Sequence, residues 1–249
     1  MGKSTKKMEE VEKAARSVLS PSIEKFIAQV APQPIAAPEE LWQIVLVGQI
    51  DHRVHHPFWY KDLGVLSEQE FSVARDTFAA GNAFCFDCGS FSLVVYPDKW
   101  QIQTTARNQR NRLAEIAYKV FDEKYFELPL LAFGINAHLH KKTTAKDAIL
   151  SLAAVLSKIG LGFELNGEAS VDLAFRNEYD GRTVYKSITR SPIGQSYIYL
   201  NYNGHHSLTH HRAKFKIEED MKPWLDQEWS AAEAYASFLS AKIGQIAKG

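Results

Sequence analysis

The chain has 249 residues, of which 45% are hydrophobic, so it can bury the core of one large domain or of two modest ones. Lysine plus arginine balances aspartate plus glutamate at 29 each, which excludes a global field that would draw the protein toward nucleic acid. No apolar run approaches the roughly 20 residues of a membrane span, and the N-terminus lacks the apolar core of a secretory signal. We therefore expect a cytoplasmic protein without membrane contact.

The first segment, residues 1–38, reads as a helical arm followed by a linker. Met8, Val11 and Ala15 recur at three- and four-residue spacing, which is typical of an amphipathic helix. The stretch "APQPIAAPEE" then brings three prolines, and a proline-rich segment is a stiff spacer. The sequence predicts a domain boundary near Pro38.

The sequence predicts that residues 39–142 form a first unit, which contains both helices and strands. "LWQIVLVGQI" is a nearly continuous apolar strand, a pattern typical of a strand covered on both faces. Ser67 and Glu70 form a capping box, so a helix begins there and ends near Gly81. A strand hairpin with a Pro97-Asp98 turn follows, then a helix over about 108–126 and the strand "LLAFGINAHLH".

Residues 143–249 predict a second unit of the same kind. Thr144 and Asp147 begin an apolar helix that ends near Gly160, three strand-like runs reach about residue 206, and a long helix closes the chain. The predicted fold class is therefore α+β, with two consecutive small sheet-and-helix units, an N-terminal helical arm and a long C-terminal helix.

The closing helix carries an apolar seam with alternating four- and three-residue steps, as in a heptad pattern. Such a seam needs a partner surface. It docks either on the protein's own sheet or on a second copy of the chain, and the residues of this candidate oligomer seam are Leu225, Trp229, Ala232, Ala236, Leu239, Ile243 and Ile246.

Three stretches, "FSLVVYPDKWQIQTT", "PLLAFGINAHLH" and "YIYLNYN", resemble a sporadically distributed family of uncharacterised bacterial proteins. The resemblance covers about residues 91–140 well. Its most specific element is a hairpin that ends in Thr-Thr, then a helix, then a strand with Gly134-Ile135-Asn136. It implies a context among phage-defence genes or mobile elements, and it carries no catalytic residue over to this chain.

The histidines are candidate metal ligands, because imidazole nitrogen binds zinc and related ions. Side chains at positions i and i+2 of a strand share a face, so two histidines of "NAHLH" can chelate one ion with a third ligand from another segment. Ordinary hydrogen-bonding roles in the core or at the surface are the alternative. The candidate metal set is His138, His140, His206 and His210.

The stretch "TTARNQRNR" is a candidate anion or nucleic-acid site. Arg107, Arg110 and Arg112 precede or open a helix, whose N-terminus disfavours cations, so an anion would compensate them. Thr104 and Thr105 can add hydroxyl donors. Exposed arginines without a ligand are the alternative reading.

Signatures of common enzymes, such as a Walker loop or a nucleophile elbow, are absent from the sequence. We expect a non-catalytic bacterial assembly or binding component that forms homo-oligomers or binds other protein subunits, serves phage defence or a mobile element, and needs no cofactor. One alternative is a hydrolase or nuclease that depends on a divalent metal such as zinc or manganese. A second is an accessory protein that binds nucleic acid through its arginines.

Overall fold

A computed structural model of the protein describes residues 39–122, 130–158, 173–179, 182–208 and 216–246. The fold is α+β, as predicted, and a long helix closes it. The predicted helical arm, residues 1–38, lies outside the described residues.

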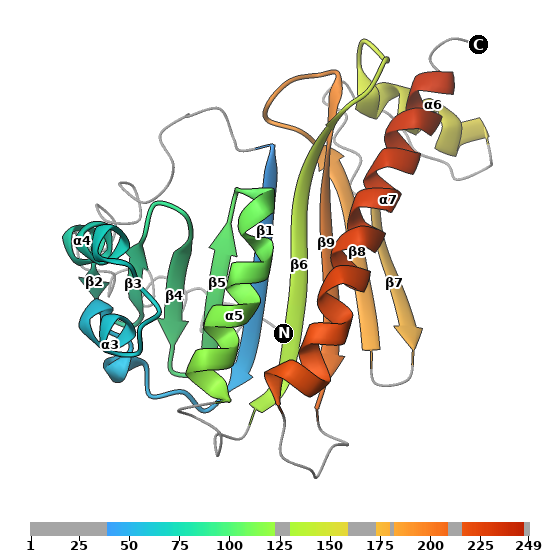
Figure 1. Cartoon of the computed structure of the whole chain (residues 1–249). Coiled ribbons are helices and arrows are strands. Elements are labelled where there is room, and N and C mark those ends of the chain that lie inside the picture. Colours follow the sequence, from blue (N-terminus) through green and yellow to red (C-terminus); the bar gives the residue numbers. More distant parts are fainter. Residues whose placement is uncertain (1–38, 123–129, 159–172, 180–181, 209–215, 247–249) are drawn as a thin grey trace, which may run out of the picture. The chain divides into compact units, whose positions relative to one another are not determined.

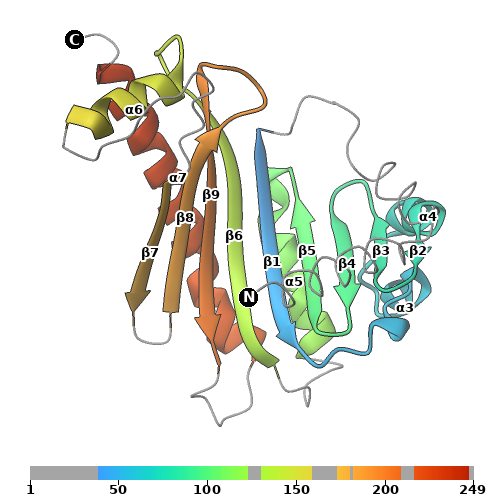
Figure 2. The same cartoon turned by 180° about the vertical axis from the view of Figure 1, so that it is seen from behind.

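Among the described residues, nine antiparallel strands form one sheet in the order β2-β3-β4-β5-β1-β6-β9-β8-β7 (Figures 1 and 2). In β5 and β9, buried residues alternate with more exposed, mostly polar ones, which is the pattern of a sheet covered on one face. The apolar strand β1, predicted to be covered on both faces, has its fully buried side chains Trp42, Ile44 and Leu46 on the helix side. Their bounds are β1 Glu40–Gly48, β2 Ala79–Ala80, β3 Phe84–Asp87, β4 Ser92–Tyr96, β5 Lys99–Thr104, β6 Leu130–Lys142, β7 Leu173–Tyr179, β8 Arg182–Arg190 and β9 Tyr197–Ser207.

The two halves of the chain repeat one order of elements: a strand, a helical segment, a run of antiparallel strands and a helix that packs on the sheet. In each half the last strand pairs with the first, β5 with β1 and β9 with β6. The two predicted units are nevertheless joined, because β1 and β6 pair at the centre of a single sheet. The predicted division between 39–142 and 143–249 is corrected, since β6 opens the second half instead of closing the first.

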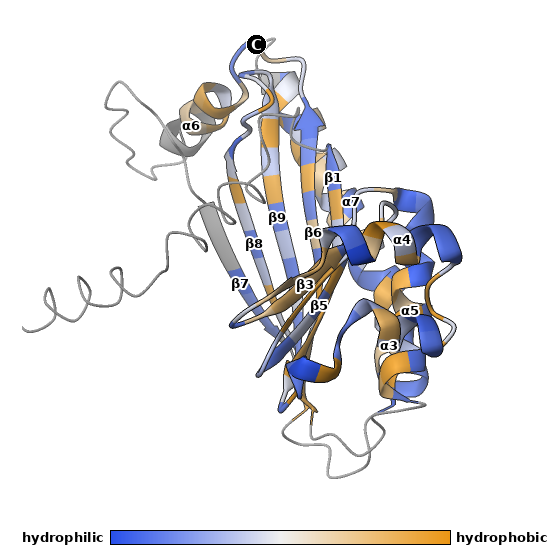
Figure 3. Cartoon of the chain, turned by 90° about the vertical axis from the view of Figure 1, so that its left-hand side faces the viewer, coloured by the Kyte–Doolittle hydropathy of each residue, from blue (hydrophilic) through white to orange (hydrophobic). Residues whose placement is uncertain are grey.

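One face of the sheet carries the helices (Figures 1 and 3). They are α3 Pro57–Asp62, α4 Glu68–Thr77, α5 Arg110–Phe121 and α7 Lys222–Ile246, with the short turns η1 His52–Val54, η2 Arg107–Gln109 and η3 Ile217–Met221. A further helix, α6 Ala148–Lys158, lies at the end of the sheet where β6 and α7 end (Figure 1). Within the described ranges, no helix is long and apolar enough to span a membrane.

The capping box predicted for α4 is confirmed. Ser67 accepts a hydrogen bond from the backbone N–H of Glu70, and the carboxylate of Glu70 accepts one from the backbone N–H of Ser67. The helix is shorter than predicted and ends at Thr77, because Ala79 and Ala80 pair with β3 as the edge strand β2.

The apolar seam of α7 docks on the protein's own sheet, which was the first of the two alternatives. Trp229 contacts the ring of Trp42 edge to face, with centroids 6.1 Å apart, and its indole N–H donates to the carbonyl of Asn136. Leu239 is partly buried against the same core, and the side chain of Ile246 lies outside the described part. The remaining seam residues are buried in the core: Leu225, Trp229, Ala232, Ala236 and Ile243.

Gly204 of β9 lets α7 approach the sheet closely. A Cβ atom at this position would lie 2.5 Å from the carboxyl carbon of Glu228 on α7. No side chain larger than hydrogen fits unless the helix or the glutamate moves. The residue type at position 204 is thus set by the helix–sheet distance.

We predict that Gly204→Ala destabilises the protein by about 2 kcal/mol or more, because overpacking at a closed contact forces strain into its neighbours. Gly194→Ala is the matched control, since its Cβ would lie 3.8 Å from Tyr197, an ordinary contact. Urea unfolding of both variants measures the difference. Equal unfolding midpoints for the two variants would contradict the close contact.

Candidate functional site

The face opposite the helices is lined by polar side chains, and we call it the open face. The pairing register places one residue from each of eight strands in a single row across it. Only the two ends of this row carry a formal charge. From β3 to β7 the row runs Asp87, Ser92, Gln103, Gln43, Asn136, Asn203, Tyr185 and Arg176.

The four central side chains, Gln103, Gln43, Asn136 and Asn203, form what we call the amide row. Asn136 Nδ2 donates to Gln43 Oε1 at 2.7 Å, and Gln43 Nε2 donates to Gln103 Oε1 at 3.0 Å. Gln43 and Asn136 each expose only 8% of their surface. Polar groups this deeply placed need partners, so their hydrogen bonds hold these side chains in defined positions.

His138 and His140 share the open face, as the strand spacing predicted. His138 Nδ1 lies 2.5 Å from the hydroxyl of Tyr199, and His140 Nδ1 lies 2.8 Å from the hydroxyl of Ser191. Burial lowers the pKa of both imidazoles, and for His138 the neighbouring His140 lowers it further. Both rings are therefore held neutral near pH 7 by their surroundings.

The predicted four-histidine metal set does not come together. His206 lies on the helix-covered face, where it stacks on Phe133 and contacts the ring of Trp224. His210 lies outside the described residues. Within the described ranges, no three histidine, cysteine, aspartate or glutamate side chains are grouped so that they could hold a metal ion. The set is corrected to a pair, His138 and His140, because the strand register places His206 opposite Phe133, whose side chain points to the covered face.

A buried charged cluster surrounds Glu228, between α7 and strands β8 and β9. Arg182 donates from Nε and Nη2 to the two carboxylate oxygens at 2.6 and 2.8 Å. The hydroxyl of Tyr202 donates at 2.6 Å, and His206 Nε2 lies 2.9 Å from Oε1. Glu228 is fully buried, and every partner comes from the sheet.

The surroundings of Glu228 favour its charged form. Burial alone would raise the pKa of this carboxyl, but hydrogen bonds from His206, Arg182 and Tyr202 outweigh burial and lower the pKa to about 2. Burial and the same carboxylate raise the pKa of Tyr202, which keeps its hydroxyl proton. The cluster is therefore a fixed ion pair that fastens α7 to the sheet.

At the predicted anion site, carboxylates of the protein itself pair with the three arginines. Arg107 and Arg110 both pair with Glu233 of α7, Arg110 at 2.9 Å, and the guanidinium of Arg110 stacks 4.5 Å over the ring of Trp42. Arg112 pairs with Glu70 at 2.7 Å. The unfavourable charge at the helix N-terminus is thus compensated by carboxylates of the fold, on the covered face.

The predicted threonines lie at the end of β5 and directly after it. Thr104 is buried and donates its hydroxyl to the carbonyl of Ser90, whereas Thr105 is exposed. Both line a small polar pocket of about 80 Å³, together with Gln103 at one end of the amide row. The side chain of Thr104 shares the covered face with Trp100 and Ile102, and within the described ranges neither threonine contacts the carboxylate partners of the arginines.

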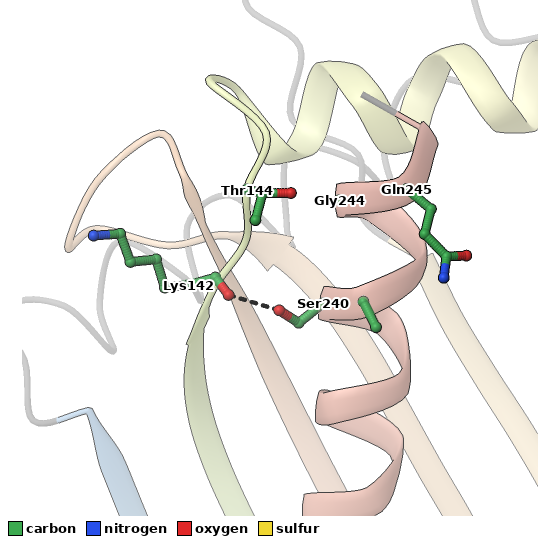
Figure 4. A pocket seen from close by; sticks show the side chains of 6 residues that line it. Lys142, Thr144, Ser240, Gly244 and Gln245 are labelled. Carbon is green, nitrogen blue, oxygen red and sulfur yellow. Dashed lines mark hydrogen bonds between the residues drawn. The ribbon is translucent and has the colours of Figure 1, made fainter. Parts of the chain in front are cut away.

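A second pocket, of about 230 Å³, lies between the end of α7 and the segment that follows β6 (Figure 4). The hydroxyl of Ser240 donates to the carbonyl of Lys142 at 2.6 Å, and Thr144 faces Gly244 across the gap. In Figure 4 the amine of Lys142 extends away from these residues. The groups that converge here are neutral, and their contacts join the helix end to the sheet.

The amide row was missed by the sequence reasoning. The signal available was the alternation of glutamine with apolar residues in "KWQIQTT" and of asparagine with tyrosine in "LNYN". An outward amide is ordinary on a half-covered strand, so one strand alone does not single it out. Only the register of β5, β1, β6 and β9 shows that four amides meet.

No family model matches the chain, and no curated protein is similar to it. A solved structure, that of the di-domain ARO/CYC StfQ from the steffimycin biosynthetic pathway, aligns with 82% of this chain over 98% of its own length. The sequence identity is 9% and the TM-score is 0.24. Similarity at this level says nothing about the function of the chain.

We predict that Glu228→Gln destabilises the protein by about 3 kcal/mol, because it leaves the buried guanidinium of Arg182 without its counter-charge. The pKa of Glu228 is lower in the folded state than in the unfolded chain, so its contribution is present above about pH 4.5 and is lost as the pH falls toward 2. Urea unfolding between pH 7 and 2 measures both effects. The free energy of unfolding of the variant should fall less steeply between pH 4.5 and 2 than that of the wild type.

Glu233→Gln is the matched control, because it lies on the same helix and also pairs with arginine, but its side chain is 22% exposed. A pair that water reaches contributes about 1 kcal/mol or less. If the two variants unfold alike and with the same pH dependence, the Glu228 cluster does not fasten the helix.

Proposed function

We propose that the protein is a non-catalytic assembly component that binds a second copy of itself through the open face. The observation that carries this proposal is the amide row, an uncharged and hydrogen-bonded strip on the face opposite α3, α4, α5 and α7. The apolar seam of α7 is buried in the protein's own core, so it does not offer a surface to a partner.

The state of the ionisable groups supports a binding role over catalysis. Glu228 is held charged within a closed set of partners beneath α7, where its oxygens accept from Arg182 and Tyr202 and contact His206. On the open face, His138 and His140 are neutral and already contact hydroxyl groups. The hydrogen bonds of these groups hold parts of the fold together, which favours a structural role for them.

A second copy suits the open face because an amide group both donates and accepts hydrogen bonds, so a row of amides is complementary to itself. In a two-fold interface the same patch of both copies is in contact, so a charged patch would face its own charge and repel. The formal charges of the chain balance at 29 each, which leaves two copies without long-range repulsion. Nucleic acid is favoured less, because Arg107, Arg110 and Arg112 are paired with carboxylates.

The biological setting in this proposal follows the resemblance of the sequence to the sporadically distributed bacterial family. It places the assembly in the cytoplasm, in an anti-phage defence or mobile-element system.

We predict that light scattering of the full chain gives twice the 28.1 kDa mass of one copy, and that Tyr185→Glu returns it to one copy. Tyr185 lies in the row across the open face and is 42% exposed, so the substitution places like charges in a two-fold interface. Phe238→Glu is the control, on α7 and 55% exposed, and should keep the double mass. A wild-type mass of one copy at all concentrations would refute the proposal, and so would equal dissociation by both variants.

A further inference from the structure

The row of residues across the open face ends in opposite charges. Asp87 on β3 lies at one end and Arg176 on β7 at the other, near opposite edges of the sheet, and both residues are exposed (Figure 1). Six uncharged residues separate them, one on each intervening strand. Because neighbouring strands lie about 4.8 Å apart, seven strand steps separate the two charges by roughly 30 Å. Within one copy the two side chains therefore do not meet.

The acidic end of the row lies at the pocket of about 80 Å³. Asp87, Ser92 and Gln103, the first three residues of the row, all line this pocket. Oδ1 of Asp87 accepts a hydrogen bond from the backbone N–H of Gly89. Among the described residues no cation pairs with Asp87, so the pocket offers a carboxylate without a counter-charge and the hydroxyl of Ser92 beside it. A guanidinium group carries several N–H donors and suits such a place.

The basic end of the row is held weakly. The guanidinium of Arg176 pairs with Glu178 on the same strand and lies 5.8 Å from the centre of the Tyr185 ring. The side chain of Arg176 is 61% exposed and that of Glu178 is 64% exposed. An ion pair that water reaches this freely is weak, so Arg176 can exchange Glu178 for another carboxylate.

A two-fold interface in which the rows of two copies lie over each other has two possible orientations. With the axis along the row, Asp87 faces Asp87 and Arg176 faces Arg176. With the axis across the row, parallel to the strands, the ends are exchanged and each Asp87 faces an Arg176. Like charges repel and opposite charges attract, so the second orientation, with the rows reversed, is favoured.

The sizes of the neighbouring side chains favour the same orientation. Tyr185 comes directly before Arg176 in the row, and Ser92 comes directly after Asp87. When the rows are reversed, the large side chain of Tyr185, which is 42% exposed, lies over Ser92, the smallest residue of the row. With the axis along the row, the two tyrosine rings would instead face each other.

We propose that the two copies pack with their rows reversed, so that the pocket beside Asp87 in each copy receives the guanidinium of Arg176 from the other. This inference rests on the proposed function, and it names the side chain through which one copy recognises the other. The interface then contains two equivalent charge pairs, one at each end of the row.

Charge reversal in the full chain tests this pairing. Asp87→Lys sets two cations against each other at both ends of the interface, and Arg176→Glu sets two carboxylates against each other. Each variant alone should dimerise at least about tenfold more weakly than the wild type, because two equivalent pairs change from attraction to repulsion. An equimolar mixture of the two variants brings opposite charges together at both ends and should regain the wild-type affinity. Analytical ultracentrifugation measures the dimer Kd in each case.

Neutral substitutions decide between the two orientations. Asp87→Asn keeps the side-chain oxygen that accepts from Gly89, so the local turn is retained. With the rows reversed, Asp87→Asn and Arg176→Gln each remove two attractions and should raise the dimer Kd about threefold or more. With the axis along the row, each would remove a repulsion and lower the Kd. If Asp87→Lys does not fold, as urea unfolding would show, these two variants carry the test.

Asp76→Lys is the matched control, because it makes the same change of charge at an exposed carboxylate of α4, on the helix side. It should dimerise as the wild type does. The inference is overturned if folded reversal variants dimerise like the wild type, if their mixture does not recover, or if Asp87→Asn strengthens the dimer. A wild-type dimer that does not respond to these charges refutes only the reversed rows. A wild-type chain that stays a single copy refutes the proposed function and this inference together.

Discussion

The ion pair between Glu228 and Arg182 is the interaction on which the arrangement of the second half depends. A charge buried this completely is tolerated only because Arg182, Tyr202 and His206 surround it from two neighbouring strands. Gly204 removes the side chain that would keep the helix away. Together they set the height and position of α7 over β8 and β9, and the apolar seam of the helix then lies against the centre of the sheet.

The same arrangement gives the sheet two different faces. The face under α5 and α7 carries the large aromatic residues, the arginine–carboxylate pairs and the buried glutamate. The other face carries amides, hydroxyls and neutral histidines in register across the central strands. The buried charges are paired on the helix side, whereas the centre of the open face offers hydrogen bonds from uncharged side chains. Under the proposed function, this surface would recognise a partner by the positions of its donors and acceptors.

The sequence predicted the fold class, the capping box at Ser67 and the long closing helix, because these depend on local patterns. It also predicted that His138 and His140 share a face, which follows from the two-residue period of a strand. It did not predict that β1 and β6 join the two units, or that Asn136 lies beside Asn203, since pairing register depends on contacts between distant segments. His206 was grouped with the wrong histidines for the same reason. Histidines that are close in the sequence do not reveal which face of the sheet each imidazole ring lies on.

The central claim is that the helix side of the sheet is closed and that the open face makes the contact with a partner. Hydroxyl-radical footprinting over a concentration series tests this most directly, because it reports side chains one by one. The account predicts that Tyr185 and Tyr199 become protected as the concentration rises, while Phe238 and Tyr118 on the helix side stay reactive. Protection of Phe238 and Tyr118, with Tyr185 and Tyr199 unchanged, would contradict it.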